Sequence, residues 1–365
     1  MKNSFGNNVT ITIFGESHGS SIGVVLDGLS SGIPIDEAFI AHQLTLRRPS
    51  GRISTSRVEA DEYVLESGVF NGYTTGTPIC IRIPNTNTRS KDYSATRYLA
   101  RPSHADLTAE YKYAGYQDYR GGGHFSGRIT AGLVAAGAIA LSALKTKGIS
   151  LGTHISRIKD VKDRPFADYQ TDIAFLNQQS FPFLDEQSGK SAKELIEELA
   201  NSGDSCGGVL ETAVINLPAG VGEPWFDSVE SLLAHGLFAI PAVKGVEFGS
   251  GFGFADLKGS QANDPFCMKG DKIVTVTNHN GGINGGISNG MPIIFRTVIK
   301  PTPSIYKKQS TVDFARKEDT VLQIAGRHDP AIIHRARVVV DSITALVLCD
   351  LLETFFGENY FTEKH

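Results

Sequence analysis

The chain has 365 residues and a formal charge of −4 at pH 7, from 35 basic and 39 acidic residues. This slightly acidic total excludes a protein that coats nucleic acid through overall positive charge. Hydrophobic residues make up 41% of the chain, enough to form a sizeable core, which excludes wholesale disorder. Glycine departs from the average: its 39 residues are about 11% of the chain, against roughly 7% in ordinary proteins. The glycines follow no collagen-like period, so we expect the excess in turns and loops.

The N-terminal part predicts a strand pair followed by a helix. The segments VTITIF (9–14) and IGVVLDG (22–28) are rich in β-branched residues and flank the turn GESHGSS (15–21). Asp36 is expected to cap a helix that runs to Leu46, and further strands are predicted at 58–66 and 78–83. No apolar signal segment precedes these elements, so a cytoplasmic location is expected.

Residues 84–128 form a long irregular stretch rich in Arg, Tyr, His and Gly, which is typical of a functional loop. After it we expect helices at 129–145, 191–201, 228–239 and 336–356, strands at 151–158, 208–216, 273–277 and 293–299, and a second irregular loop at 300–334. The uncharged stretch Ile129–Leu144 is shorter than the roughly 20 residues of a bilayer span, so a buried helix is expected.

These blocks of strands and helices favour an α+β fold. Two segments share a pattern in which a loop with His and Arg leads into an apolar helix, at 124–145 and at 327–356. This pattern is a hint of internal duplication, but chance resemblance of two buried helices would explain it equally well. We treat residues 1–365 as a single catalytic domain, with the break of a pseudo-repeat expected near 150–205.

The charge is unevenly distributed along the chain. Residues 47–128 hold ten Arg and two Lys against eight acidic residues, and residues 296–337 hold nine basic residues against four acidic ones. The two irregular segments therefore carry +4 and +5, in a remainder of −13. Because Arg binds carboxylate and phosphate in a planar, bidentate manner, this distribution predicts a site for a small polyanion between the two loops. Nucleic acid is not expected as a partner, since no basic helical stripe or stacking motif is present.

Several motifs suggest chemistry. GESHG (15–19) matches the GxSxG pattern of serine hydrolases, but a predicted strand follows it where a nucleophile elbow needs a helix. The glycine runs at 249–253 and 281–286 do not form a dinucleotide fingerprint, and no metal-ligand spacing is present. The segments RPSHAD (101–106) and RHDP (327–330) place His and Asp in the two cationic loops, which favours acid–base chemistry on an anion.

Taken together, the motifs resemble those of the chorismate synthase family, in the same order over nearly the whole chain. They are FGESHG (14–19), RRP (47–49), RSKDYS (89–94), RPSHADLTAEYKYAGYQDYRGGGHFSGR (101–128), AVKGVEFG (242–249), GGINGGISNGMPI (281–293), KPTPSI (300–305) and GRHDP (326–330). The resemblance implies a layered β-α-β sandwich, with helices between two antiparallel sheets and internal pseudo-symmetry, assembled as a homotetramer.

The resemblance also implies the reaction. The family converts 5-enolpyruvylshikimate 3-phosphate to chorismate and phosphate by a 1,4-anti elimination that needs reduced FMN without net redox change. This is a lyase step of the shikimate pathway and of aromatic amino acid biosynthesis. The substrate is a small polyanion, which agrees with the charge distribution. The sequence does not indicate whether NADPH serves as the reductant of the flavin, and no membrane partner or metal is expected.

Residue roles follow by position in the matching motifs. The resemblance implies that His18 protonates the departing phosphate, that His104 governs flavin protonation, and that Asp329 assists proton removal from C6 of the substrate through N5 of the flavin. Expected anion-binding residues are Ser17, Arg47, Arg52, Arg101 and Arg327. Expected flavin contacts are His124, Phe125, Ser126, Ala242, Gly285 or Gly286, Lys300, Pro301, Thr302, Pro303, Ser304 and Arg327.

Two departures from the family pattern are visible. Many members have Arg-Ser-Ser where this chain has His124-Phe125-Ser126, so a fixed cation near the flavin is lost. The loop RRPSGRISTSR is one residue shorter than the commoner form of the family. The alternative from another class is a flavin-binding or polyanion-binding module without turnover, which differs from the enzyme in whether His18, His104 and Asp329 converge.

Overall fold

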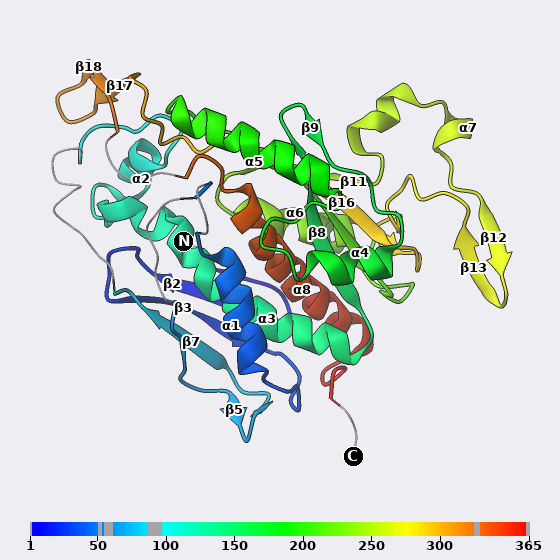
Figure 1. Cartoon of the computed structure of the whole chain (residues 1–365). Coiled ribbons are helices and arrows are strands. Elements are labelled where there is room, and N and C mark those ends of the chain that lie inside the picture. Colours follow the sequence, from blue (N-terminus) through cyan, green and yellow to red (C-terminus); the bar gives the residue numbers. More distant parts are fainter. Residues whose placement is uncertain (1, 50–52, 55–60, 87–96, 325–328, 363–365) are drawn as a thin grey trace.

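Two antiparallel sheets enclose a layer of helices in the computed structural model (Figure 1), which describes residues 2–49, 53–54, 61–86, 97–324 and 329–362. The first sheet has the strand order β1-β2-β3-β7-β4 and the second has the order β11-β16-β10-β8-β9. The first sheet consists of β1 (Ser4–Phe5), β2 (Thr10–Gly15), β3 (Ser21–Asp27), β7 (Ile79–Pro84) and β4 (Val64–Leu65). The second consists of β11 (Val243–Phe248), β16 (Ile293–Ile299), β10 (Gly208–Ile215), β8 (Ser150–Ile158) and β9 (Val161–Lys162).

Four helices form the layer between the sheets: α1 (Glu37–Arg47), α3 (Thr130–Thr146), α6 (Val229–Ala239) and α8 (Ile333–Phe356). Helix α3 packs on β3 and β7, α8 packs on β8 and β10, and the two helices pack on each other. Of the remaining helices, α4 (Tyr169–Leu176) contacts β8 and β10, while α2 (Asp106–Tyr113), α5 (Glu186–Asn201) and α7 (Gly259–Ala262) complete the set. This arrangement confirms the expected α+β sandwich.

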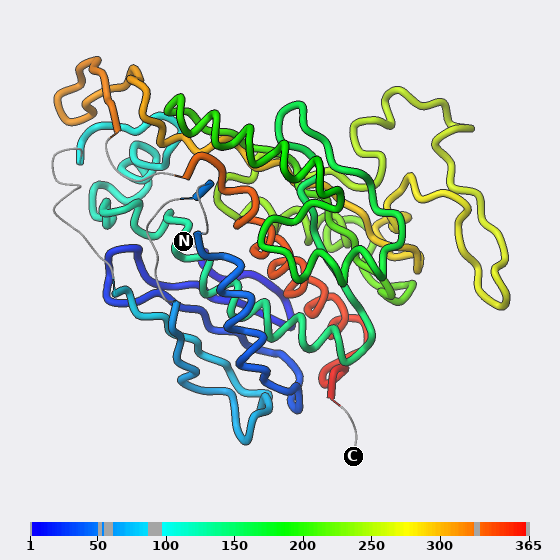
Figure 2. Tube along the Cα trace, in the orientation of Figure 1, coloured from blue at the N-terminus to red at the C-terminus, as the bar shows by residue number. Residues whose placement is uncertain are grey.

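The same order of elements occurs twice along the chain. Strands β2 and β3, helix α1, strand β7 and helix α3 form the first set, and β8, β10, α6, β16 and α8 form the second. In both sets the third strand pairs antiparallel with the second, and the closing helix packs on the sheet. Figure 2 shows the blue strands of the first set and the green and orange strands of the second on opposite sides of α3 and α8. The pseudo-symmetry expected from the sequence is therefore visible in the topology.

The centre of the core is the contact between α3 and α8. A Cβ atom at Gly137 would lie 2.2 Å from Cβ of Ser342, so only glycine allows the two helices this separation. By length and composition the segment Gly127–Thr146 could cross a membrane, yet 78% of its most apolar window is buried inside the protein. The uncharged stretch 129–144 is thus a core helix, as its length predicted.

Most predicted elements are confirmed with shifts of a few residues. Asp36 caps α1, accepting a hydrogen bond from the backbone N–H of Phe39 at 2.9 Å. Three predictions were wrong in part. The irregular stretch 84–128 contains α2, the loop 300–334 contains the hairpin β17 (Gln309–Asp313) and β18 (Glu318–Leu322), and the described part of 58–66 forms only the short strand β4.

Short hairpins extend from the sandwich. They are β5 (Val69–Phe70) with β6 (Tyr73–Thr74), β12 (Phe266–Lys269) with β13 (Lys272–Thr275), and β14 (Ile283–Asn284) with β15 (Ile287–Ser288). The hairpin β12–β13 projects from the molecule together with α7 (Figure 1). The helix predicted at 191–201 begins earlier, at Glu186, because Asp185 caps it, and α4 was not predicted.

Candidate active site

The turn that carries Ser17 and His18 joins β2 to β3 at the edge of the helical layer. Both side chains are buried. The backbone N–H of Ser17 donates to the carbonyl of Gly123 at 3.0 Å, which ties the turn to a second glycine-rich loop. Because β3 begins at Ser21, a strand follows the turn, and the helix that a nucleophile elbow requires is not there. The geometry therefore disfavours the serine hydrolase interpretation.

The second loop, Arg120–Phe125, lies directly against His18. Gly121 has φ +58°, and a Cβ atom at this position would lie 2.3 Å from Cε1 of His18 and 3.2 Å from Oγ of Ser17. The imidazole thus fits against a backbone that only glycine can supply. Nδ1 of His124 lies 2.8 Å from the carbonyl oxygen of Gly15 and fixes the loop to the start of the turn. Two motifs far apart in the sequence form one surface here.

Phe125 and Ser126, also predicted as flavin contacts, continue this surface. Phe125 is partly exposed and lies edge-on to Tyr113 of α2, with ring centroids 6.0 Å apart. Oγ of Ser126 accepts a hydrogen bond from the backbone N–H of Arg128 at 3.3 Å and begins the 3-10 turn Gly127–Ile129. The segment 124–126 therefore connects the His18 turn to Arg128.

Arg47 and Arg128 share a single buried carboxylate. Nη2 of Arg47 donates to Oδ2 of Asp61 at 2.9 Å, Nη1 of Arg128 donates to Oδ1 of Asp61, and the Asp61 side chain is 1% exposed. Nη1 of Arg47 also donates to the carbonyl of Gly127 at 3.4 Å. Two guanidiniums on one carboxylate give the group a net charge of +1, which favours an anionic ligand nearby.

The pKa values of this group reflect burial opposed by attraction. Burial acts to raise the pKa of Asp61, but the adjacent Arg47 and Arg128 outweigh it and hold the pKa below its usual value. Burial lowers the pKa of Arg47, against the attraction of Asp61. Among the described residues, Nε of Arg47 is a buried donor without a hydrogen-bond partner. A buried unpaired donor of this kind suits an acceptor on a bound ligand.

His104 contacts the second predicted flavin segment, residues 300–304. Its Nε2 lies 2.8 Å from Oγ of Ser304, which is 200 residues away in the sequence. Nζ of Lys300 donates to the carbonyl of Ser103 at 2.6 Å, and the backbone N–H of Lys300 donates to the carbonyl of Ala242 at 2.9 Å. The fold thus brings His104, Ala242 and the segment 300–304, including Pro301 and Pro303, into one neighbourhood.

Residues 205 and 206 connect the segment 300–304 to the segment that carries Asp329. Oγ of Ser205 donates to the carbonyl of Thr302 at 2.6 Å, and the backbone N–H of Cys206 donates to the carbonyl of Pro330 at 2.9 Å. Oγ1 of Thr302 is a buried donor or acceptor without a partner among the residues that the structure describes. The segments carrying His104 and Asp329 therefore lie on either side of residues 205–206.

Asp329 is also connected to the group formed by Arg47, Asp61 and Arg128. Nη1 of Arg335 donates to Oδ2 of Asp329 at 2.7 Å, and Nε of Arg335 donates to the carbonyl of Arg47 at 2.8 Å. Next to it, Nε2 of His334 lies 2.9 Å from Oγ of Ser54. Burial lowers the pKa of His334 to about 3, so this imidazole is neutral at physiological pH.

The remaining predicted anion-binding residues differ in placement. Arg101 forms a bidentate pair with Asp106, with Nε–Oδ2 and Nη2–Oδ1 distances of 2.8 and 2.7 Å, so two of its donors are already used. Burial acts to raise the pKa of Asp106, but the hydrogen bonds and charge of Arg101 lower it overall. Arg52 and Arg327 lie outside the described residues.

Gly285 and Gly286 are not brought to this site within one chain. They form the turn between β14 and β15, where the carbonyl of Gly286 accepts a hydrogen bond from the backbone N–H of Val229, the first residue of α6. Ala242 follows the other end of α6. Lys300 follows Ile293 by seven residues along β16, which corresponds to about 23 Å at roughly 3.3 Å per residue. The predicted flavin contacts therefore occupy two separate places.

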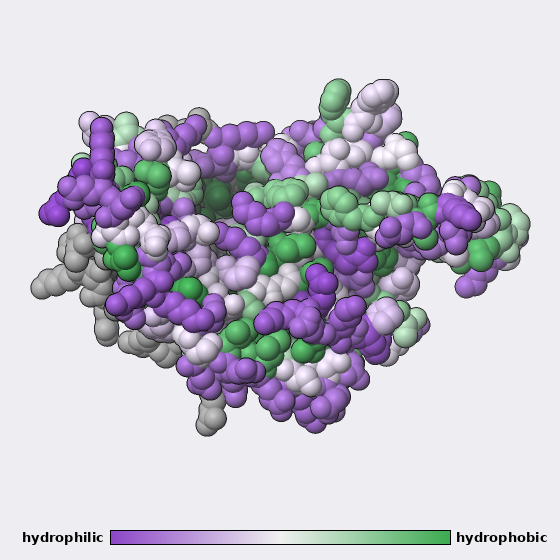
Figure 3. Space-filling view, turned by 90° about the horizontal axis from the view of Figure 1, so that it is seen from above, coloured by the Kyte–Doolittle hydropathy of each residue, from purple (hydrophilic) through white to green (hydrophobic). Residues whose placement is uncertain are grey.

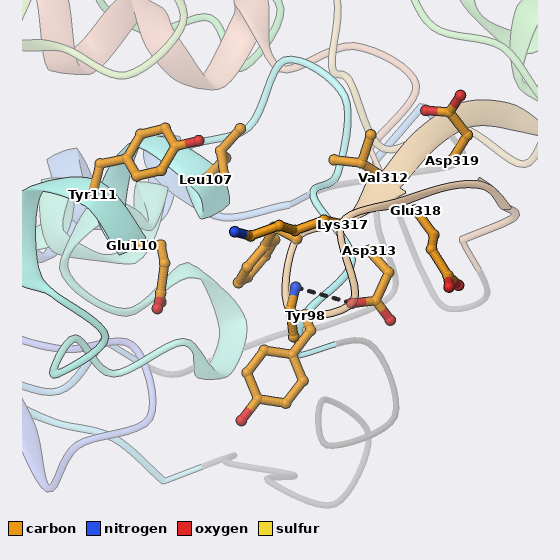
Figure 4. A pocket seen from close by; sticks show the side chains of 11 residues that line it. Tyr98, Leu107, Glu110, Tyr111, Val312, Asp313, Lys317, Glu318 and Asp319 are labelled. Atoms are coloured by element: carbon orange, nitrogen blue, oxygen red, sulfur yellow. Dashed lines mark hydrogen bonds between the residues drawn. The ribbon is translucent and has the colours of Figure 1, made fainter.

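A cavity of about 450 Å³ lies between α2 and the hairpin β17–β18 (Figure 4). Its charged lining is mainly acidic, with Glu110, Asp313, Glu318 and Asp319 against Lys317. This sign of charge does not suit a polyanion. None of the predicted site residues lines this cavity, so it is separate from the group around Arg47 and His18. Among the described residues, no group of three or more His, Cys, Asp or Glu side chains is arranged to hold a metal ion.

Comparison with known proteins places this geometry in a family. The family model for chorismate synthase matches residues 9–352. The chain belongs to the chorismate synthase family. A chorismate synthase of Thermococcus gammatolerans is 45% identical over 348 residues, which cover 95% of this chain and 96% of that protein. One of Dehalococcoides mccartyi is 46% identical over 354 residues, 96% of each chain. A crystal structure of chorismate synthase superposes with a TM-score of 0.76 at 28% identity, over 97% of this chain and 94% of the other.

As a member of this family, the protein is a lyase of the shikimate pathway. Its candidate site also contains residues that the sequence motifs did not single out. These are Asp61, Arg128 and Arg335, together with Asn85, whose Oδ1 accepts a hydrogen bond from Nε of Arg128 at 3.1 Å. Arg128 is the last residue of the motif at 101–128 and lies two residues after the predicted flavin segment 124–126, so its position was a signal. Asp61 and Arg335 gave no comparable signal, because their roles arise from contacts with Arg47, which lies 14 and 288 residues away.

Proposed function

We propose that this protein converts 5-enolpyruvylshikimate 3-phosphate to chorismate and phosphate by a 1,4-anti elimination that requires reduced FMN, without net redox change. The observation that carries the proposal is the buried guanidinium of Arg47, whose Nε has no partner among the described residues and which lies in the same hydrogen-bonded group as Asp329. A cation in this state suits the phosphate or a carboxylate of the substrate, where a charge-assisted hydrogen bond contributes roughly 1.5–3 kcal/mol.

The residues present fit a flavin. The polar side chains of His104 and Ser304, the buried Oγ1 of Thr302 and the glycine backbone at Gly121 offer hydrogen-bonding groups and a flat approach for a ring. His124, Phe125, Ser126, Ala242 and Lys300 would hold the rest of the cofactor. When bound, reduced FMN supplies the electron density that assists the loss of phosphate.

His18 is proposed as the acid that donates a proton to the departing phosphate. Its imidazole is buried between the Ser17 turn and the backbone of Gly121, which fixes its direction and excludes bulk water. Histidine is the side chain most often used to transfer a proton to a reacting group, so His18 suits the role of acid when the bond to phosphate breaks. Arg47 and Arg128 hold the anion in place, and Ser17 contributes a hydroxyl beside His18.

Asp329 is proposed to accept the proton that leaves C6 of the substrate, and His104 to hold a proton near the flavin. The bridge through Ser205 and Cys206 supports a common site, because it joins the segments that carry these two residues. A carboxylate that is already held within hydrogen-bond distance of the reacting atom can accept the proton without the entropy cost of being brought into position.

The test is anaerobic incubation of the purified protein with reduced FMN and 5-enolpyruvylshikimate 3-phosphate, with phosphate and chorismate measured together. We expect equal amounts of both products. Binding of FMN and substrate without either product would instead support a binding module. Repetition with oxidised FMN, with and without NADPH, shows whether the chain reduces its own flavin.

We also propose that the enzyme is a homotetramer in the cytoplasm, acting as one catalytic domain. The segment that projects from the molecule around α7 and the hairpin β12–β13 shows hydrophobic surface in Figure 3. In and near this segment, large apolar side chains are exposed that a monomer would leave in water, namely Phe252, Phe266, Met268, Ile273 and Val276. In such an assembly, the Gly285–Gly286 turn of one copy would contact the flavin site of another copy. Sedimentation equilibrium tests this, and a monomer at micromolar concentration would contradict it.

A further inference from the structure

The first turn of α8 joins two parts of the site through one guanidinium. Arg335 donates from Nη1 to Oδ2 of Asp329 at 2.7 Å and from Nε to the carbonyl of Arg47 at 2.8 Å. The side chains of Arg335 and Asp329 are 18% and 14% exposed. A single side chain thus spans from a proposed base to the end of the helix that carries the anion-binding Arg47.

The backbone that carries Arg335 is firmly held. Ile333 and His334, which precede it, are buried, and His334 lies in hydrogen-bond distance of Ser54 at 2.9 Å. Helix α8 continues for 24 residues through the core. The guanidinium therefore starts from a fixed point, and its planar fork can direct two acceptors at once.

Asp329, in contrast, belongs to no helix or strand. The backbone next to it is anchored by the hydrogen bond between Cys206 N–H and the carbonyl of Pro330, but this contact does not set the direction of the carboxylate. The ion pair with Arg335 does constrain the direction of the carboxylate, because it joins Oδ2 of Asp329 to a guanidinium that starts from a fixed helix. Arg335 itself lies outside the sequence motifs.

We propose that Arg335 is a positioning residue for the elimination, orienting the carboxylate of Asp329 relative to the anion held at Arg47. This inference rests on the proposed function, since it assigns Arg335 to the proton transfer at C6. A reacting group displaced by about 1 Å can lose about a hundredfold in rate, so loss of this orientation acts on turnover more than on binding.

The experiment compares Arg335→Gln and Arg335→Lys with wild type and with Arg164→Gln. Arg164 also joins an aspartate to a backbone carbonyl, because it donates to both carboxylate oxygens of Asp172, at 2.9 and 2.6 Å, and to the carbonyl of Pro165 at 3.0 Å, so it serves as the control for loss of an Arg–Asp pair. For each protein, kcat, KM, the affinity for reduced FMN and the kinetic isotope effect of substrate deuterated at C6 are measured anaerobically. Thermal unfolding reports stability separately.

We expect Arg335→Gln to lower kcat by roughly 10- to 100-fold while KM and FMN affinity change less than about threefold. The isotope effect rises, because cleavage of the C6–H bond becomes slower relative to the other steps. Arg335→Lys keeps the charge but cannot reach both acceptors, so it recovers only part of the rate. Arg164→Gln leaves kcat and the isotope effect unchanged.

A double-variant cycle with Asp329→Asn completes the test. If Arg335 acts through Asp329, the double variant is no slower than Asp329→Asn alone. Additive losses, an unchanged isotope effect, or a loss confined to KM would overturn the inference. If Arg335→Gln does not fold, Arg335→Lys decides by the same measurements. An inactive wild type would overturn the proposed function and this inference together, whereas an active wild type with an unaffected Arg335→Gln would overturn the inference alone.

Discussion

Two clusters of charged residues in this molecule have different structural settings. The first, Arg47, Asp61 and Arg128, lies where α1 ends and irregular segments meet, and it carries a net charge of +1. The second lies on the second sheet, where Arg296 of β16 contacts Glu211 of β10 and Glu247 of β11, and His154 of β8 lies between Asp163 and Glu211.

The difference lies in how the donors are used. Nε, Nη1 and Nη2 of Arg296 donate to Glu247, Glu211 and the carbonyl of Gly249, so acidic groups and backbone from adjacent strands satisfy them. Nε of Arg47 has no such partner among the described residues. The first cluster therefore keeps a donor available for the anion proposed above, whereas the charged groups of the second cross-link a sheet. Substitutions in matched pairs can break or sharpen this distinction.

The largest effect is expected from the two histidines. His18→Asn removes the proposed acid and should lower kcat about 100- to 10,000-fold, the usual contribution of general acid catalysis, with a smaller change in KM. His154→Asn removes a buried histidine of the second cluster and should leave kcat unchanged. Steady-state kinetics with reduced FMN checks both. Equal losses in the two variants would show that the distinction between the clusters is wrong.

A second pair of substitutions tests the contact between the backbone of Gly121 and the imidazole of His18. Gly121→Ala and Gly122→Ala both place a side chain at positive φ, +58° and +84°, so both bear similar backbone strain. Only the Cβ atom at residue 121 would clash with His18, because the nearest neighbour at residue 122 is Cβ of Ser126 at 3.9 Å. We expect Gly121→Ala to lose about a hundredfold in kcat and Gly122→Ala less than about fivefold.

The controls for this pair are thermal unfolding and substrate binding. Similar melting temperatures for the two variants would show that strain is matched. If both variants then lose activity equally, the contact between Gly121 and His18 has no catalytic role.

These residues also show how far the sequence could lead. The β-branched runs predicted β2 and β3, and the acidic cap at Asp36 predicted the start of α1. Helix α2 was missed because Ala109 alone among its residues is buried, which leaves little apolar periodicity. The hairpin β17–β18 was missed for the same reason, since most of its residues are half-exposed or exposed and many are polar.

For the site, motifs could suggest residues that come from short, unusual segments, such as His18 and His124. They could not identify Asp61 or Arg335. The pairing of Asp61 with Arg128 joins residues 67 apart, and that of Arg335 with the carbonyl of Arg47 joins residues 288 apart. Such contacts depend on tertiary packing, which has no local signature in the sequence.

A third pair of substitutions compares Arg47 of the first cluster with Arg296 of the second. Arg47→Ala should raise KM for the substrate about 10- to 100-fold, because it removes a charge-assisted hydrogen bond of roughly 1.5–3 kcal/mol to the anion. Arg296→Ala also removes a partner of carboxylates, so it should lower the free energy of unfolding while KM stays within about twofold. Substrate titrations and urea unfolding measure the two effects. An equal rise of KM in both variants would contradict the assignment.

The smallest expected effect is the pH dependence of the second cluster. Burial acts to lower the pKa of His154, but its hydrogen bonds to Asp163 and Glu211 outweigh this and raise the pKa above its usual value. A raised folded-state pKa gives stability that is fully present below about pH 6.5, the ordinary value, and is lost as pH rises through the folded-state pKa. The destabilisation caused by His154→Asn should therefore be larger at about pH 5.5 than at about pH 9. Urea unfolding of both proteins at the two pH values gives the difference directly. A larger destabilisation at the higher pH would mean that the neutral imidazole is the stabilising form, and that the second cluster does not depend on a charged histidine between its carboxylates.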